Sequence, residues 1–71
     1  MKFTDSFGNE VNEGTRIKIL SNYNYAHWNN KIATVIWDSK HGQFQFVFDD
    51  DKSKIGHDFW GIHEFKVDSK S

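Results

Sequence analysis

The sequence predicts an all-β protein that folds as a single small barrel of about five antiparallel strands. Its apolar residues fall in short runs that alternate with polar residues, and no stretch shows the period of about 3.6 residues that marks an amphipathic helix. Glycine, asparagine and aspartate separate these runs, and proline is absent. A flat sheet in a chain of 71 residues would leave one apolar face in water, so a closed or half-open barrel is expected.

The first third of the chain predicts a turn followed by a strand. The glycine–asparagine pair at residues 8–9 is typical of a tight turn and indicates a short N-terminal hairpin, and Gly14 marks the end of the next connection. Residues 15–20 (TRIKIL) alternate between apolar and polar side chains. Ile17 and Ile19 therefore lie on one face of the predicted strand, with basic residues on the other.

Three further segments complete the predicted barrel. Residues 31–38 (KIATVIWD) are rich in β-branched residues and apolar on both faces, which indicates the most buried strand. Residues 43–49 (QFQFVFD) place three phenylalanines on one face, and a hairpin connection at residues 39–42 joins these two strands. Residues 58–67 (DFWGIHEFKV) predict a last strand or a bent pair of strands, with Gly61 at a bulge or sharp bend.

A single domain is expected over residues 1–71, with a short N-terminal hairpin at one end and a frayed tail at residues 68–71 (DSKS). The chain has no cysteine, so large aromatic side chains must fill the core in place of disulfides, and Phe, Trp and Tyr make up 17% of the residues. The predicted core consists of the inward residues of the strands: Ile17, Ile19, Ala33, Val35, Phe44, Phe46, Phe48, Phe65 and Val67.

Composition and charge narrow the class of protein. The formal net charge is −1, which argues against a general electrostatic grip on nucleic acid. The N-terminus has no apolar segment of the kind found in signal peptides, and no apolar run approaches the roughly 18 residues of a membrane-spanning helix. We therefore expect a cytoplasmic protein without a membrane partner.

Two segments carry a resemblance to a known kind of domain. Residues 12–20 (NEGTRIKIL) place a glycine before a strand of alternating apolar residues. Residues 29–35 (NNKIATV) are similar to a motif of a glycine, two residues, a second glycine, one residue and a valine, with Asn30 and Ala33 at the two glycine places. Asparagine tolerates a left-handed backbone, whereas alanine does not replace glycine where such a backbone is needed.

These segments resemble the SH3-like barrels, and within them the KOW-type variant, over Gly14 to Val35. The closing residues 59–67 (FWGIHEFKV) are similar to the last strands of such barrels, and the order of parts agrees over most of the chain. The resemblance implies an SH3-like fold and brings nucleic-acid binding into consideration. Small stand-alone barrels of this kind are common among bacteriophage and mobile-element proteins.

Enzymatic activity is not expected. The chain has no cysteine, no nucleophile motif of the G-x-S-x-G type and no glycine-rich phosphate-binding loop. At residues 57–58 and 63–64 a histidine precedes an acid, but adjacent residues of a strand point to opposite faces and are not prearranged to share a proton. Neither a metal nor a cofactor is expected, because the histidines lack paired ligand spacing. These histidines are His27, His41, His57 and His63.

Two interpretations of the run Asp49–Asp51 stay open. As a structural feature, the three carboxylates follow the uncharged, strongly β-prone run FQFVF and act as gatekeepers against aggregation. As a functional feature, they form an acidic patch for a basic partner or imitate the charge of a nucleic acid. The structural interpretation is favoured, since runs of like charge are usually solvated.

The segment NYNYAHWNNK, residues 22–31, is the strongest candidate for a binding surface. Tyrosine and tryptophan give a large contact area at low entropic cost, and they are enriched in interaction hot spots. We predict a non-catalytic module that binds another protein through an aromatic loop surface. Its predicted binding residues are Tyr23, Tyr25, His27 and Trp28, with Trp60 as an outlying member.

The opposite interpretation is that some of these rings only complete a small core. Trp28 would then plug one mouth of the barrel, and for both Trp28 and Trp37 the sequence leaves core and binding roles open. Tyr23 and Tyr25 are separated by one residue, so they share a face if the segment is extended, and exposure is expected for both.

Two further functions remain as alternatives. Binding of single-stranded nucleic acid or RNA would combine loop aromatics that stack on bases with contacts from Arg16, Lys18 and Lys31 to phosphates. Self-association as a homodimer would place an exposed aromatic rim in a symmetric interface.

Overall fold

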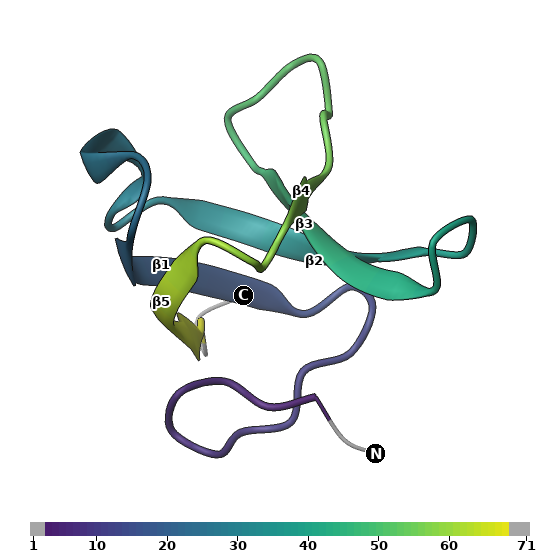
Figure 1. The fold of residues 1–71 in the computed structure, drawn as a ribbon, viewed down its shortest axis with the longest axis horizontal. Helices are drawn as coiled ribbons and strands as arrows, with labels where there is room; N and C mark the ends of the chain where they lie inside the picture. The colour runs from purple at the N-terminus through teal and green to yellow at the C-terminus, as the bar shows by residue number, and fades with distance from the viewer. Residues whose placement is uncertain (1–2, 69–71) are drawn as a thin grey trace.

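Five antiparallel strands form one curved sheet in the computed structural model, which describes residues 3–68 (Figure 1). The strands are β1 (Arg16–Asn22), β2 (Ile32–Asp38), β3 (Gln43–Phe48), β4 (His57–Asp58) and β5 (Ile62–Val67). A single turn of 3-10 helix, η1 (Ala26–Trp28), lies between β1 and β2. The predicted all-β class with five antiparallel strands is therefore confirmed.

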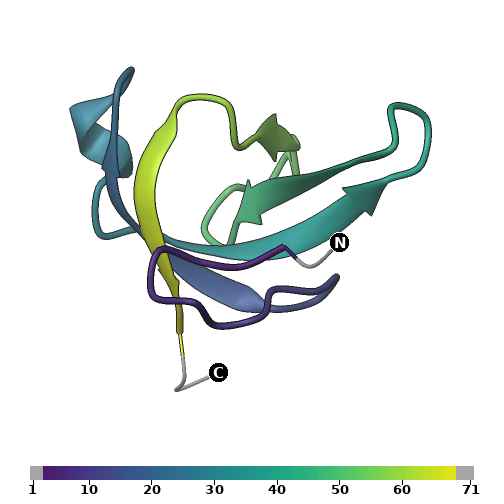
Figure 2. The same cartoon turned by 60° about the horizontal axis from the view of Figure 1, so that its bottom comes forward.

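The hydrogen-bonded order of the strands is β4-β3-β2-β1-β5, so that β4 and β5 are the two edges of the sheet. Figure 2 shows how the sheet curves and brings β5 round towards β4. Among residues 3–68 no strand pairing joins these two edges, and the sheet is not closed into a barrel. The reason is the shortness of β4, because a strand of two residues pairs with β3 and then turns directly into the connection to β5.

The strand register follows the alternation of apolar residues. β2 and β3 form a regular hairpin in which Ala33 lies opposite Phe48. β1 lies between β2 and β5, and Ile17 has Ala33 opposite it on one side and Val67 on the other. Because side chains alternate between the two faces of a strand, this register gathers the apolar residues on the inner face of the sheet.

The core within residues 3–68 contains the buried residues Val11, Ile17, Ile19, Ala33, Val35, Phe46, Phe48 and Phe65. All of them except Val11 were predicted. Phe44 and Val67, which were predicted as well, are partly buried and pack against this core. Val11 lies in the polar run NEVNEG, where no alternation marks it as a core residue.

A short hairpin precedes β1. Thr4 and Glu10 form an isolated antiparallel bridge, and Gly8 has a φ of +85° in the left-handed region that favours glycine. The hairpin lies along β5, since the Ser6 N–H donates to the Phe65 carbonyl and the Ser6 hydroxyl accepts from the Phe65 N–H, both at 3.1 Å. The N-terminal segment therefore covers the outer edge of β5.

Asp5 is the buried carboxylate that fixes this hairpin. It accepts hydrogen bonds from the N–H groups of Phe7, Asn9 and Val67 at 2.8–2.9 Å, and from the Asn9 side-chain amide at 3.1 Å. Burial acts to raise the pKa of Asp5, but these hydrogen bonds, with that from Val67 first, hold the pKa below its ordinary value of 3.8.

The C-terminal end of the described chain continues the pairing with β1. The Asp68 N–H donates to the Arg16 carbonyl at 2.8 Å, so the first residue of the predicted frayed tail is held by the sheet. The rest of that tail, residues 69–71, lies outside the described residues.

Candidate binding surface

The loop between β1 and β2 is organised by one side chain, that of Asn22. Its Oδ1 accepts hydrogen bonds from the N–H groups of Asn24 (3.0 Å) and Tyr25 (2.7 Å). Its Nδ2 donates to the Tyr25 carbonyl at 2.8 Å and to Asn29 Oδ1 at 2.9 Å. This is a side-chain turn of the kind that asparagine forms readily, and it folds the loop back on itself.

Tyr23 is held at both its backbone and its ring. Its N–H donates to the Gly61 carbonyl at 2.9 Å, which ties the loop to the β4–β5 connection. Its hydroxyl lies 2.6 Å from His63 Nδ1, and the two ring centroids are 5.1 Å apart. The side chain is nevertheless exposed, with 73% of its surface accessible.

Tyr25 belongs to a second group of rings. Its centroid lies 4.7 Å from that of Trp28 and 5.7 Å from that of His27, and the tyrosine is 49% exposed. Both tyrosines are exposed as predicted. The loop is not extended, however, because the Asn22 turn separates them, and each tyrosine packs against a different neighbour.

Trp28 lies between the loop and the core. Its ring meets those of Phe46, Phe48 and His57 edge-on, with centroid distances of 5.9, 5.2 and 4.9 Å. It is half-buried and packs against the core cluster. These contacts support the interpretation of Trp28 as a residue that completes the core. Tyr25 packs against Trp28 and is therefore held in place.

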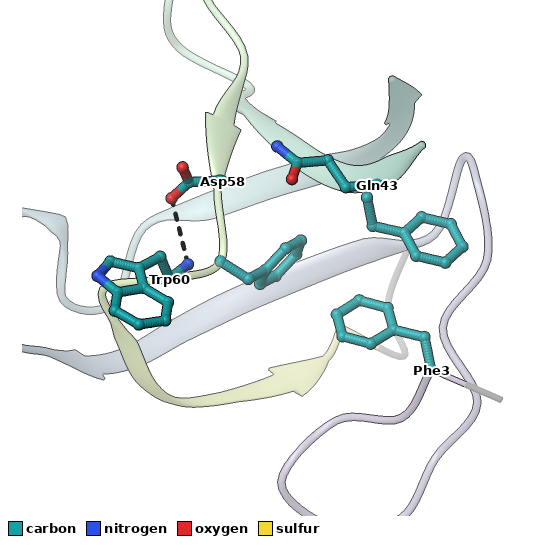
Figure 3. A pocket seen from close by; sticks show the side chains of 6 residues that line it. Phe3, Gln43, Asp58 and Trp60 are labelled. Atoms are coloured by element: carbon teal, nitrogen blue, oxygen red, sulfur yellow. Dashed lines mark hydrogen bonds between the residues drawn. The ribbon is translucent and has the colours of Figure 1, made fainter. Parts of the chain in front are cut away.

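Trp60 and Trp37 stand apart from these rings. Within residues 3–68 no ring contact joins Trp60 to the tyrosines or to Trp28, although the Gly61 that follows it bonds to Tyr23. Trp60 is 91% exposed on the β4–β5 connection (Figure 3). Trp37 is 45% exposed and stands edge-on to Phe44 at 4.9 Å.

The predicted bend at Gly61 explains how the loop reaches this connection. A Cβ atom at Gly61 would collide with the side-chain amide of Asn24. The bare glycine therefore lets the β1–β2 loop approach closely, and a larger residue would require the Asn24 side chain to move.

The turn that enters β2 contains Asn30 in the left-handed region, with a φ of +71°. Its N–H donates to the Ile19 carbonyl at 2.6 Å, and the Ile19 N–H donates to the Lys31 carbonyl at 3.0 Å. The prediction that Asn30 tolerates a glycine-like backbone is confirmed. Ala33, at the second glycine place of the motif, is instead a buried residue of regular strand.

The carboxylates of the run Asp49–Asp51 form ion pairs and hydrogen bonds with nearby side chains. Asp49 forms an ion pair with Arg16 and accepts a hydrogen bond from the Thr34 hydroxyl at 2.9 Å. Asp50 lies 3.1 Å from Lys31. Two of the three basic residues proposed for nucleic-acid contact are therefore engaged with carboxylates of this run.

Asp51 and Asp38 stabilise the two turns that flank β3 in the sequence, one after β3 and one before it. The Ser53 hydroxyl and N–H donate to Asp51, and the hydroxyl contact, 2.7 Å long, is the main cause of a lowered pKa of Asp51. His41 Nδ1 lies 2.6 Å from Asp38 Oδ2, and this contact lowers the pKa of Asp38. Both carboxylates thus stabilise the turns beside which they lie.

The remaining histidines have separate surroundings. His63 contacts Tyr23, His57 packs beside Trp28, and His27 lies near Tyr25. Within residues 3–68 no group of three or more histidine or acidic side chains is placed to hold a metal ion.

Comparisons with protein-family models, with curated protein sequences and with solved structures found no significant match to this chain. In the part of the chain that the structure describes, no helix is long and apolar enough to cross a membrane.

Proposed function

We propose that this protein is a non-catalytic, cytoplasmic binding module that recognises another protein through its aromatic loop surface. This surface consists of Tyr23, Tyr25 and His27, with Trp28 as its support. The observation that carries the proposal is the combination of exposure and order. Both tyrosines are exposed, yet the Asn22 side chain and the Tyr23–Gly61 hydrogen bond fix the backbone that carries them.

Order of this kind favours binding. A flexible aromatic loop would lose conformational entropy when a partner immobilises it, whereas a preorganised loop has already lost it during folding. Tyrosine adds contact area and a hydroxyl that a partner can bond. The contact with His63 holds the Tyr23 hydroxyl in a fixed position, from which it can form a further hydrogen bond to a partner.

We also propose that the curved sheet is an SH3-like barrel of the KOW type that stays open at one seam. Support comes from two backbone positions. Gly14 has a φ of +90° two residues before β1, and Asn30 has a glycine-like φ two residues before β2. Both belong to the segments that carry the resemblance.

Nucleic-acid binding is the second candidate, favoured by one observation. Lys18 and Lys66 lie directly opposite each other in the pairing of β1 with β5, and neither forms an ion pair within residues 3–68. Like charges placed opposite each other repel, and a phosphate between them would relieve this repulsion. The engagement of Arg16 and Lys31 with Asp49 and Asp50 makes a protein partner the better supported choice.

Site-specific photocrosslinking tests the proposal. A photoreactive phenylalanine derivative at position 25 is expected to crosslink to a protein partner in cells, whereas the same residue at position 7 is not. Phe7 is a suitable control because it is exposed on the N-terminal hairpin, away from the loop. Crosslinks to nucleic acid from position 25 would favour the second candidate, and crosslinks only to copies of this chain would favour self-association.

A further inference from the structure

An aromatic hollow of about 450 Å³ lies beside the β4–β5 connection (Figure 3). It is lined by Phe3, Gln43, Phe44, Asp58, Phe59 and Trp60. The Phe3 ring stacks on Phe44 at 5.0 Å and meets Phe59 edge-on at 5.0 Å, so these three rings support one another. None of the loop residues Tyr23, Tyr25 and His27 lines this hollow.

The hollow carries a negative charge at its rim, from the side chain of Asp58. Among the described residues 3–68, Asp58 is the only charged residue that lines it. One oxygen of the Asp58 carboxylate accepts a hydrogen bond from the backbone N–H of Trp60 at 3.2 Å, as the dashed line in Figure 3 shows. The other oxygen has no hydrogen-bond or ion-pair partner within residues 3–68. An exposed carboxylate at the rim of an apolar hollow is complementary to a cation that carries apolar groups.

Trp60 strengthens this complementarity. It is the most exposed of the large apolar side chains in the described chain. Of the aromatic side chains, tryptophan gives the strongest attraction to a cation above its face. Because Asp58 and Trp60 lie at the same rim, one cationic group can reach both.

The neighbouring sheet edge indicates that the ligand is a polypeptide. β4 is an edge of the sheet, and no strand within residues 3–68 pairs with its outer side. The edge of β5, in contrast, is covered by the N-terminal hairpin through Ser6 and Asp5. An extended chain that lies along His57–Asp58 can hydrogen bond to this open edge while one of its side chains enters the hollow.

We propose that the hollow binds an extended segment of a partner protein in which an arginine or lysine stands beside an apolar residue. The apolar side chain packs on Phe3, Phe44 and Phe59, and the cation lies between Asp58 and Trp60. This second site does not depend on the aromatic loop surface, and a partner that uses both would gain avidity from two separate contacts.

Selection from a random peptide library displayed on phage tests this site with the full chain as bait. Peptides enriched by the unmodified protein are expected to carry a basic residue next to an apolar one, and the Asp58→Asn protein is expected to lose that enrichment. The Asp50→Asn protein removes the same charge outside the hollow and should select the same peptides. Enrichment of peptides without basic residues, or no enrichment, would overturn the proposal.

Affinities of one enriched peptide then locate its site. Asp58→Asn is expected to weaken binding about fivefold, the scale of an exposed ion pair, and Trp60→Ala about fivefold to tenfold, the scale of an exposed cation–π contact with its packing. Phe7→Ala should leave the affinity unchanged, and thermal unfolding checks that each variant is folded. Unchanged binding by Asp58→Asn and Trp60→Ala, or loss of binding on Tyr25→Ala alone, would place the peptide elsewhere and overturn the proposal.

Discussion

The carboxylate of Asp5 accepts a hydrogen bond from the backbone N–H of Val67 at 2.8 Å, and so joins the two ends of the described chain. Asp5→Ala removes this acceptor and leaves the backbone N–H groups of Phe7, Asn9 and Val67 without their side-chain acceptor. We expect a loss of about 2–4 kcal/mol in the free energy of unfolding, because unsatisfied donors in a partly buried site are costly. Asp50→Ala, which removes an exposed carboxylate, should cost less than about 1 kcal/mol.

The same contact predicts how stability depends on pH. The pKa of Asp5 is lower in the folded protein than its ordinary value of 3.8, so the folded state favours the ionised form. The stability from this group is present in full above its unfolded pKa and is lost as the pH falls through the folded pKa. Denaturant unfolding at pH 7 and below pH 4 should show this loss in the unmodified protein, and Asp5→Ala should reduce it. The pKa values of Asp38 and Asp51 are also lowered, so these two groups act in the same direction.

The sequence shows why Asp5 and Val11 escaped prediction. The Asp5 carboxylate is buried where the N-terminal hairpin meets Val67, a contact between residues 62 positions apart, and Val11 of the same hairpin joins the core cluster. Alternation of apolar residues reports on faces within one strand and carries no information about such a contact. The local signal for Asp5 was present, since an aspartate shortly before a glycine is typical of a side-chain turn.

The strands themselves were predictable because their alternation is local. Ile17 and Ile19 in β1 and the phenylalanines of β3 show their inner face directly in the sequence. The exposure of Tyr23 and Tyr25 followed from their polar neighbours in the same way. The partner of Tyr23, His63, did not follow, because it depends on how the β1–β2 loop packs against β5.

Trp28 and Trp60 are expected to differ in how much each contributes to the free energy of unfolding. Trp28→Ala removes edge-on contacts with Phe46, Phe48 and His57, and should lower the free energy of unfolding by about 3 kcal/mol or more. Trp60→Ala removes an exposed ring and should change it by less than about 0.5 kcal/mol. Thermal or denaturant unfolding measures both. Equal effects of the two substitutions would contradict the placement of Trp28 as the lid of the core.

The order of the loop is expected to depend on Asn22. Asn22→Ala removes the four hydrogen bonds of its side chain and should cost about 1–2 kcal/mol. Faster hydrogen exchange at the Tyr25 amide should accompany this loss. Asn24→Ala is the control, because it deletes the neighbouring amide side chain and leaves the Asn22 turn in place. Slow exchange at Tyr25 in the Asn22→Ala protein would show that the loop owes its order to other contacts.

The left-handed backbone at Asn30 makes a separate prediction. Asn30→Gly should leave stability within about 0.5 kcal/mol, because glycine adopts positive φ freely. Asn30→Val should cost about 1–2 kcal/mol, because a β-branched residue is strained there. Denaturant unfolding of both variants checks this, and a stable Asn30→Val protein would be incompatible with a φ of +71° at this position.

The most direct measurement for the central proposal is quantitative affinity capture from cells with the unmodified protein, Tyr25→Ala and Phe7→Ala as baits, each verified as folded. Tyr25 and Phe7 are both exposed aromatic residues, but only Tyr25 belongs to the aromatic loop surface. We predict a protein partner that the unmodified and Phe7→Ala baits retain equally and that Tyr25→Ala loses about tenfold or more, the effect expected of a hot-spot residue. Retention of that partner by Tyr25→Ala, or its equal loss with Phe7→Ala, would contradict binding through the loop.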